Sequence, residues 1–479
     1  MAYDLLISNG TVVTADAVYP ADVAIAGGAI AAILPPGSRA DAAQIRDAAD
    51  CYVIPGAIDA HLHQSMRTAA GLTVDDWQTG STAAALGGTT TVVDFVDALP
   101  GQSLTDALAA RLEQARPAVV DYGLHMSIQP DIDPGPTGFM RRVSETRIRQ
   151  MRDAFDSGCA SFKMYMAYAG NQLSDADLFR ALREVADLGA LACVHVENGD
   201  VIETLRQLAG TDLAWVSRKE NPPVNGLGAG ILHALTRPPE SEREAVIRAM
   251  TAAELTGARM LIFHMGCASA TEALGAARAR GVDFIWGETC PQYLVLTDDC
   301  LRREDGRLWM CSPPLRPQAD QDAMWKLVSN RTIDLISSDH CPFNQTQKAL
   351  GINDFRKVPN GVPGVETRLS LIHHFGVRRG RIDLQDWVRL CCARPAEMHA
   401  LPMKGHIAPG ADADVVIFDP GLSKSLAAGE LHSALDWSAY DGITVDGWPR
   451  DVISRGDLIV RDGRFVGQPG RGRFIRRSP

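Results

Sequence analysis

The spacing of apolar residues changes twice along the chain and divides it into two β-rich ends and a long central region. Near both ends, apolar segments are short and separated by turn residues, which is typical of antiparallel strands. The strands expected there are Tyr3–Ser8, Thr11–Thr14, Val23–Ala26, Ala29–Leu34, Ala413–Phe418, Val452–Ser454 and Leu458–Val460. Asn9-Gly10, Gly27-Gly28 and Asp462-Gly463 are predicted to be turns between them. We therefore expect residues 1–53 and 404–465 to pair into one composite β-sandwich domain.

In the central region, continuous apolar runs alternate with helix-like segments. Such runs are typical of parallel strands that are buried on both faces. Eight are present: Ala57–His61, Thr89–Phe95, Val119–Ile128, Cys159–Met166, Ala190–Glu197, Ala258–Met265, Val282–Glu288 and Thr332–Asp339. The helix-like segments between them include Leu104–Ala115, Asp175–Leu188, Arg243–Leu255 and Ser269–Arg280. Eight strand–helix units close a (β/α)8 barrel, so we predict an α/β fold with a TIM-like barrel over residues 54–403.

Composition and charge restrict the partners of such a protein. The 479 residues suffice for a barrel and a second domain, and 46% hydrophobic with 22% charged residues is ordinary for a soluble globular chain. A net charge of −11 disfavours nucleic acid, and we expect the basic segment 470–477 to be a solvated tail. No apolar stretch reaches the roughly 20 residues that span a bilayer, so no membrane partner is expected. Ten scattered cysteines without a Cys-x-x-Cys pair predict reduced thiols in a cytoplasmic protein.

Residue types that bind metals lie at or near the ends of five of the eight expected strands. They are His61, His63, Lys163, His195, His264 and Asp339. Residues i and i+2 of a strand share a side, so both imidazoles of His61-Leu62-His63 can reach one ion. A single histidine in an apolar strand is more often a core residue than a ligand. The whole set, gathered at the mouth where barrels build their active sites, predicts a metal site.

Lys163 is the least expected member of this set. The chain has seven lysines, and this one lies inside the strongly apolar strand Ser161–Met166. Burial disfavours the charged amine and lowers its pKa unless an acid pairs with it. A neutral amine can react with carbon dioxide to form a carbamate, an anionic ligand that can bridge two cations. The alternative is an ordinary ion pair between Lys163 and an acid in the barrel interior.

Several longer motifs resemble those of one enzyme family over nearly the whole chain. They are Pro55–His63, Gly87–Phe95, Ser161–Tyr168, His195–Gly199, Ser312–Arg316, Ser338–Cys341 and the segments Gln347–Gly351, Phe355–Gly361 and Gly364–Glu366. On these motifs the chain resembles the dihydropyrimidinases and D-hydantoinases of the amidohydrolase superfamily. The last three segments distinguish this branch from allantoinases and dihydroorotases.

The resemblance implies a centre with two divalent metal ions, zinc being the first choice and manganese or cobalt fitting as well. It assigns His61, His63 and Asp339 to the more buried ion, and His195 and His264 to the second. Lys163 would carry the carboxyl group that bridges them. Asp339 would also act as the base.

Further residues match family positions that handle the substrate. Tyr168 matches the tyrosine that stabilises the oxyanion, and Ser312 and Asn360 match positions that hold the ring amide. The implied reaction is hydrolysis of a cyclic amide, a hydantoin or dihydropyrimidine ring, to an N-carbamoyl amino acid. The resemblance also implies a homotetramer or homodimer, with the tail 466–479 available for contacts between subunits.

The loop after the His-x-His motif departs from the family pattern. Within Gln64–Gly71, Arg67 stands where relatives have a proline and Thr68 where they have a phenylalanine, and Ala169 replaces a lysine after Tyr168. Because these loops contact the substituent outside the ring, an enzyme acting on another lactam or imide ring is an alternative. A non-catalytic dihydropyrimidinase-like binding protein is a second one, but such proteins have lost metal ligands, and all six ligand positions are present here.

Overall fold

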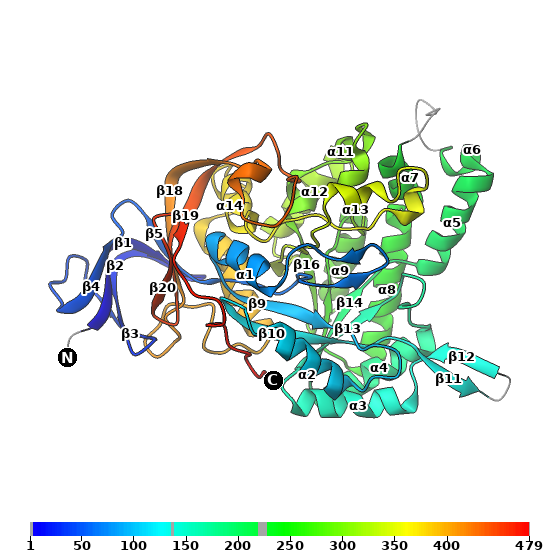
Figure 1. The fold of residues 1–479 in the computed structure, drawn as a ribbon, viewed down its shortest axis with the longest axis horizontal. Coiled ribbons are helices and arrows are strands. Elements are labelled where there is room, and N and C mark those ends of the chain that lie inside the picture. The colour runs from blue at the N-terminus through cyan, green and yellow to red at the C-terminus, as the bar shows by residue number, and fades with distance from the viewer. Residues whose placement is uncertain (1–2, 136–137, 219–227, 479) are drawn as a thin grey trace.

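Eight parallel strands form the central sheet of the computed structural model, which describes residues 3–135, 138–218 and 228–478. They are β6 (Ala57–Asp59), β9 (Thr89–Val96), β10 (Asp121–Ser127), β13 (Ser161–Tyr165), β14 (Leu191–His195), β15 (Met260–Ile262), β16 (Ile285–Thr289) and β17 (Leu335–Ile336). Each strand falls within one of the eight predicted runs, allowing one residue at the ends of β9 and β16. An isolated parallel bridge between Leu62 and His340 joins the two outer strands, so the predicted barrel is confirmed (Figure 1).

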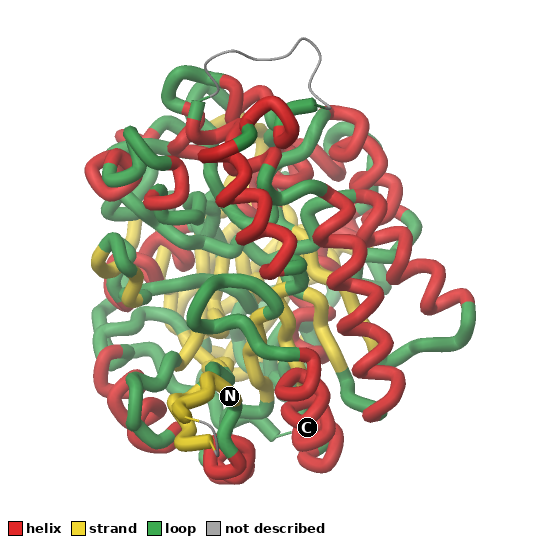
Figure 2. Tube along the Cα trace, turned by 90° about the vertical axis from the view of Figure 1, so that its right-hand side faces the viewer, coloured by secondary structure: helices red, strands yellow, loops and turns green. Residues whose placement is uncertain are grey.

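Helices surround these strands, as the tube in Figure 2 shows. The α-helices are α1 (Trp77–Leu86), α2 (Leu104–Gln114), α3 (Glu145–Asp156), α4 (Asp175–Leu188), α5 (Gly199–Thr211), α6 (Leu213–Val216), α7 (Ala229–Leu235), α8 (Pro239–Thr256), α9 (Ala268–Ala279), α10 (Pro291–Val295), α11 (Asp299–Arg302), α12 (Gln318–Ser329), α13 (Gln345–Ala349), α14 (Arg368–Ile372), α15 (Leu384–Val388) and α16 (Arg394–Met398). Within the described residues, no helix is both long and apolar enough to cross a membrane.

Both chain ends contribute strands to a second, mostly antiparallel sheet of nine strands. These are β1 (Tyr3–Val13), β2 (Val18–Ala26), β3 (Ala29–Leu34), β4 (Ala42–Asp47), β5 (Tyr52–Pro55), β18 (Val415–Ser425), β19 (Thr444–Ser454), β20 (Asp457–Arg461) and β21 (Arg464–Phe465). The N-terminal β5 pairs with the C-terminal β18. The remaining strands form two short antiparallel pairs: a hairpin of β7 (Arg67–Thr68) with β8 (Gly71–Leu72), and the pair β11 (Asp131–Gly135) with β12 (Gly138–Arg142).

One predicted turn in this sheet is wrong. Asn9-Gly10 lies inside the single strand β1, at a shift in its register with β2, rather than between two strands. Asn9 adopts a left-handed conformation with φ of 63°, and its backbone N–H donates to Asp22 Oδ1. The residue pair therefore forms a bulge, which needs the same backbone freedom as a turn but lets the strand continue.

The last residues of the chain lie against the barrel. The backbone N–H of Tyr122 donates to the Arg473 carbonyl, and the N–H of Ile475 donates to the Tyr122 carbonyl. Arg477 is 2% exposed, and its guanidinium donates to the Leu124 carbonyl and Ser161 Oγ. The expectation of a solvated tail is therefore wrong for Arg477, because its side chain finds backbone and hydroxyl acceptors beside β10 and β13.

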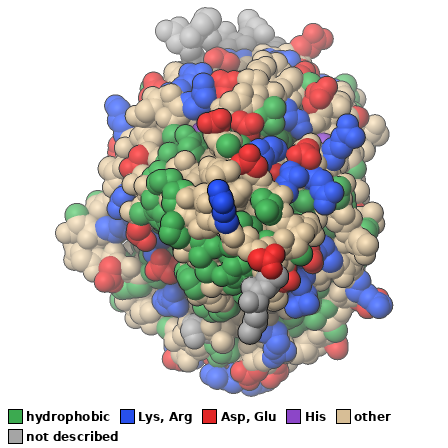
Figure 3. Space-filling view, turned by 90° about the vertical axis from the view of Figure 1, so that its left-hand side faces the viewer, with side chains coloured by type: hydrophobic (Ala, Val, Ile, Leu, Met, Phe, Trp, Pro, Cys, Tyr) green, Lys and Arg blue, Asp and Glu red, His purple; other side chains and the backbone are tan. Residues whose placement is uncertain are grey.

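The core of the nine-stranded sheet depends on both ends of the chain. Leu5, Ile7 and Val23 from the N-terminal strands pack in one cluster with Val415 and Ile453 from the C-terminal ones. Figure 3 views the molecule from the side on which this sheet lies and shows hydrophobic side chains gathered on part of its surface. We propose that residues 1–53 and 404–465 form one folding unit and 54–403 another.

Removing the first fifty residues is expected to give aggregated protein, because the apolar faces of β18 and β19 would lose their packing partners. Size-exclusion chromatography of the truncated and full-length proteins, expressed side by side, measures this. A truncated protein that is soluble and as active as the full chain would contradict the proposed unit.

Candidate active site

A cavity of about 1370 Å³ opens at the carboxyl ends of the barrel strands. Every residue predicted to belong to the site lines it: His61, His63, Lys163, Tyr168, His195, His264, Ser312, Asp339 and Asn360. These residues lie far apart in the sequence, and the parallel strands bring them together because all eight end on the same side of the barrel. The location of the cavity thus agrees with the mouth expected for an active site of this fold.

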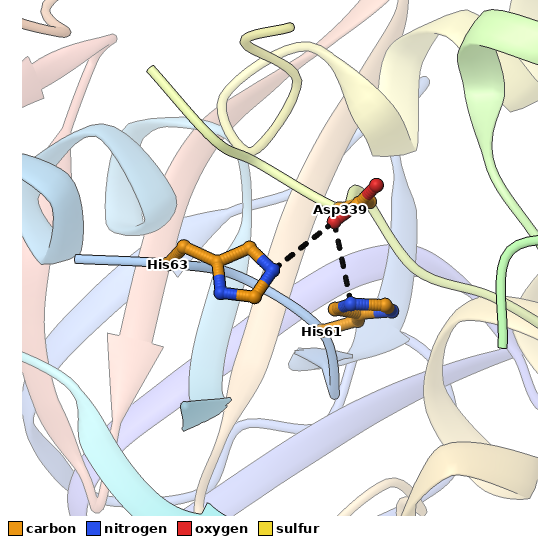
Figure 4. Close-up of side chains that lie close together, drawn as sticks. All are labelled: His61, His63 and Asp339. Carbon is orange, nitrogen blue, oxygen red and sulfur yellow. Dashed lines mark ion pairs between the residues drawn. The ribbon is translucent and has the colours of Figure 1, made fainter. Parts of the chain in front are cut away.

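The first group of candidate metal ligands is His61, His63 and Asp339 (Figure 4). Asp339 Oδ1 lies 3.3 Å from Nε2 of each histidine. One nitrogen or oxygen atom of each residue lies within 4.8 Å of the others, and all three residues are buried. His61 and His63 therefore lie on the same side, as predicted. Two imidazoles with a carboxylate suit a divalent transition metal.

The second group is His195 and His264, whose Nδ1 and Nε2 atoms lie 2.8 Å apart. The other nitrogen of His195, Nε2, lies 2.9 Å from Glu197 Oε2. Although burial alone would raise the pKa of Glu197, Arg237 and His195 lower it to about 2, so Glu197 is an anion and accepts this bond. The lone pair of His195 is consequently on Nδ1, the atom that faces His264.

A buried carboxylate orients His61 in the same way. His61 Nδ1 lies 2.7 Å from Glu288 Oε1, which also accepts the backbone N–H of His264. Burial raises the pKa of Glu288 to about 8. Because Oε1 already accepts the His264 N–H, the arrangement suits a proton on the other oxygen of Glu288 and an N–H donated by His61 Nδ1, which directs the lone pair of Nε2 towards Asp339. Sequence reasoning missed Glu197 and Glu288 as site residues, although each ends a predicted strand.

Burial also keeps these imidazoles neutral. It is the largest cause that lowers the pKa of His61 and of His264 well below the usual value, with neighbouring cationic groups adding to the effect. A neutral imidazole has a free lone pair, which is the form that binds a metal.

Lys163 lies among aromatic rings. Its side chain is buried, and Nζ lies 4.3 Å from the centre of the Phe263 ring, 4.9 Å from Tyr165 and 5.3 Å from Phe95. Burial lowers its pKa to about 8, partly opposed by Asp339 and Glu288. Among the residues that the structure describes, no acid forms an ion pair with Lys163, so the alternative of a simple Lys–acid pair finds no support.

Three of the site residues have strained backbones. Tyr168, His264 and Asp339 have φ of 74°, 39° and 47°, in the left-handed region that non-glycine residues rarely adopt. Each follows the end of its strand, where the chain leaves the sheet and turns the side chain towards the cavity. Strained conformations of this kind concentrate at functional sites, where the surrounding structure holds them.

Tyr168 and two polar residues form the wall beside the second group. The Tyr168 ring centre lies 4.7 Å from that of His195, and its hydroxyl hydrogen-bonds Ser312. Burial raises the pKa of Tyr168, which keeps the hydroxyl protonated and able to donate. Asn360 Nδ2 donates to Ser312 Oγ over 3.0 Å. Two of the three residues predicted to contact substrate, Tyr168 and Asn360, therefore both contact the third, Ser312.

The β7–β8 hairpin borders the cavity and carries the sequence departures. Thr68 Oγ1 donates to the Gly71 carbonyl over 2.8 Å, and Gln347 Nε2 donates to the Leu72 carbonyl over 2.7 Å. Arg67 is exposed and lines the cavity, and no described residue forms an ion pair with it. An available guanidinium thus stands at the entrance on a hairpin that several hydrogen bonds hold in place.

Comparison with known proteins places the chain in a well-defined group. Residues 52–459 match the model of the amidohydrolase family. A D-hydantoinase from Geobacillus stearothermophilus is 41% identical, over 99% of this chain and 96% of that protein. A D-phenylhydantoinase from Escherichia coli is 37% identical, over 99% and 98% of the two chains. The solved dihydropyrimidinase from Brevibacillus agri superimposes with a TM-score of 0.91 at 38% identity, covering 99% of this chain and 98% of its own.

Proposed function

This chain belongs to the amidohydrolase family, and we propose that it hydrolyses an amide bond within a small cyclic substrate, a hydantoin or dihydropyrimidine ring, to an N-carbamoyl amino acid. The observation that carries this conclusion is the convergence of four histidines, Asp339 and Lys163 in one cavity, in a chain that hydantoinases match almost end to end. The resemblance inferred from the motifs is confirmed by these relatives.

The residues of the cavity fit two divalent metal ions. In the first group, one ligand atom each of His61, His63 and Asp339 lies within 4.8 Å of the others. In the second group, Nδ1 of His195 and Nε2 of His264 face each other. We propose zinc for both positions, with manganese or cobalt as substitutes. Lys163, buried and without an acidic partner in the described chain, would bridge the two ions as a carbamate.

Bound metals supply Lewis acidity and lower the pKa of water, which gives a nucleophile at neutral pH. The protein groups then handle the protons and the substrate. Asp339 accepts the proton of the attacking water and passes it to the departing ring nitrogen, acting first as base and then as acid. The Tyr168 hydroxyl donates to the carbonyl oxygen as negative charge develops on it. Ser312 and Asn360 hold the ring amide.

The proposed assembly rests on the resemblance, and the proposed location rests on the ten scattered cysteines. We propose a cytoplasmic homotetramer or homodimer in which residues 466–479 contribute to subunit contacts. The second candidate function is hydrolysis of another lactam or imide ring, and the polar β7–β8 hairpin is the observation that favours it. A panel of hydantoins, dihydrouracil, allantoin and cyclic imides, assayed with the purified metal-loaded enzyme, distinguishes the two.

Lys163→Ala is expected to lose most of the bound metal, because the carbamate that bridges the ions can no longer form. Metal analysis of the purified variant measures this, and short-chain carboxylic acids are expected to restore part of the activity. Lys326→Ala, which removes an exposed lysine of α12, serves as the control. An experimental map of the metal-loaded protein that shows Lys163 as a free amine bonded to an acid would contradict the bridge.

Asp339→Asn is expected to keep the fold and much of the metal but to lose several orders of magnitude in kcat, because proton transfer fails. Tyr168→Phe should cost less, about 10²–10³-fold, as for loss of one oxyanion donor. Steady-state kinetics of both variants, with circular dichroism as the check on folding, measure these effects. If Asp339→Asn keeps even about a tenth of wild-type turnover, Asp339 is not the base.

Arg67 is expected to favour a ring that bears a polar or acidic substituent over 5-phenylhydantoin, because a guanidinium binds a carboxylate through two parallel hydrogen bonds. The measurement is the ratio of kcat/KM for the two substrates in the wild type and in Arg67→Ala, with Arg461→Ala, outside the cavity, as control. A contribution of about 1.4 kcal/mol would change this ratio tenfold. An unchanged ratio means that Arg67 does not select the substrate.

A further inference from the structure

Arg237 is a buried cation of the cavity to which the proposed mechanism gives no part. It follows α7, is 3% exposed and lines the cavity. Its Nη1 donates to Glu197 Oε2, the same oxygen that accepts the bond from His195 Nε2. Arg237 therefore contacts the carboxylate that fixes which nitrogen of His195 carries the lone pair.

The same guanidinium also lies over Tyr168. The Arg237 guanidinium carbon is 5.3 Å from the centre of the Tyr168 ring, within the range of a cation–π interaction. Because Tyr168 has a left-handed backbone conformation, contacts made by its side chain matter for holding the hydroxyl in place. One planar group thus touches both the proposed oxyanion donor and the carboxylate partner of a proposed metal ligand.

A second arginine, Arg316, hydrogen-bonds the backbone of Arg237. Arg316 Nη1 donates to the Arg237 carbonyl over 2.7 Å, and Arg316 Nη2 lies 3.2 Å from Glu242 Oε2. Glu242 in turn accepts the backbone N–H of Gly266 over 2.7 Å, two residues after His264. The chain of contacts therefore extends from Tyr168 and His195 to the turn that carries His264.

We propose that Arg237 is a positioning residue that holds Tyr168 and the Glu197–His195 pair in a fixed mutual arrangement. The proposal rests on the proposed function for the role of Tyr168. Arg237 acts on turnover through Tyr168 and on metal binding through Glu197. Lysine cannot replace it fully, because a point-like ammonium lacks the planar fork that reaches a carboxylate and a ring face together.

The first measurement is a kinetic double-mutant cycle. Arg237→Met is expected to lower kcat by about 10- to 100-fold, the range typical of a partner behind a catalytic group, with little change in KM. Combined with Tyr168→Phe, the same substitution should lower kcat by less than about threefold, because residues that act as a unit are not additive. Arg237→Lys should recover part of the loss. Effects that multiply fully in the double variant would overturn the coupling to Tyr168.

The second measurement does not depend on turnover. Competition for zinc between the apoprotein and a chromophoric chelator should show metal bound about tenfold more weakly by Arg237→Met than by the wild type. Arg147→Met is the matched control, because Arg147 is also a buried arginine whose ion pair, with Asp131, lies outside the cavity. It should leave zinc affinity and kcat unchanged. Equal zinc affinity in wild type and Arg237→Met would overturn the coupling to His195.

Arg237→Met leaves Glu197 as an unpaired buried anion, which can prevent folding. The double substitution Arg237→Met with Glu197→Gln removes both charges and is then compared with Glu197→Gln alone, whose kcat it should lower further through Tyr168. If the wild type opens none of the cyclic amides, the proposed function fails, whereas the zinc measurement still decides the coupling to His195.

Discussion

Two hydrogen bonds between imidazoles and buried carboxylates, His61 to Glu288 and His195 to Glu197, orient the side chains on which the cavity depends. A carboxylate in a barrel interior is costly unless other groups compensate it. Arg237 does this for Glu197, whereas burial raises the pKa of Glu288 to about 8 and the backbone N–H of His264 opposes this only in part. In return, each carboxylate selects one tautomer of its histidine, so the free lone pairs of His61 and His195 face the other candidate ligands.

The ends of the barrel strands carry the strain of the site. Tyr168, His264 and Asp339 leave the sheet in left-handed conformations, each of which costs on the order of 1–3 kcal/mol. Contacts with Ser312 and Arg237 hold Tyr168, and a hydrogen bond to Glu288 holds the backbone of His264. The entrance of the cavity differs from these strand ends. There the β7–β8 hairpin carries Arg67, which forms no ion pair within the described residues. The groups proposed for the chemistry and those proposed for selectivity are therefore supported by separate sets of contacts.

The sequence alone was sufficient to predict the barrel and to name nine residues that line its cavity, although it missed Glu197 and Glu288. Continuous apolar runs that alternate with helix-like segments are typical of buried parallel strands, so each of the eight strands could be located. Residues such as His61, His195 and Asp339 could be assigned to one place because parallel strands all end on the same side of a barrel. The motifs added the family, and the relatives confirm it. Asn9-Gly10 shows the limit of local patterns, because a turn and a bulge need the same residues.

Only the tertiary structure decided which residues hydrogen-bond the candidate metal ligands. Glu288 lies 227 positions from His61, and Arg237 lies 40 positions from Glu197, so no local spacing relates them. The burial of Arg477 likewise depends on acceptors in β10 and β13, which lie more than 300 positions before it in the sequence: 353 for Leu124 and 316 for Ser161. A sequence specifies residue types and their periodicity, which determine strands and candidate ligands. Hydrogen-bond partners, tautomers and the environment of a buried charge depend on distances that exist only once the barrel has closed.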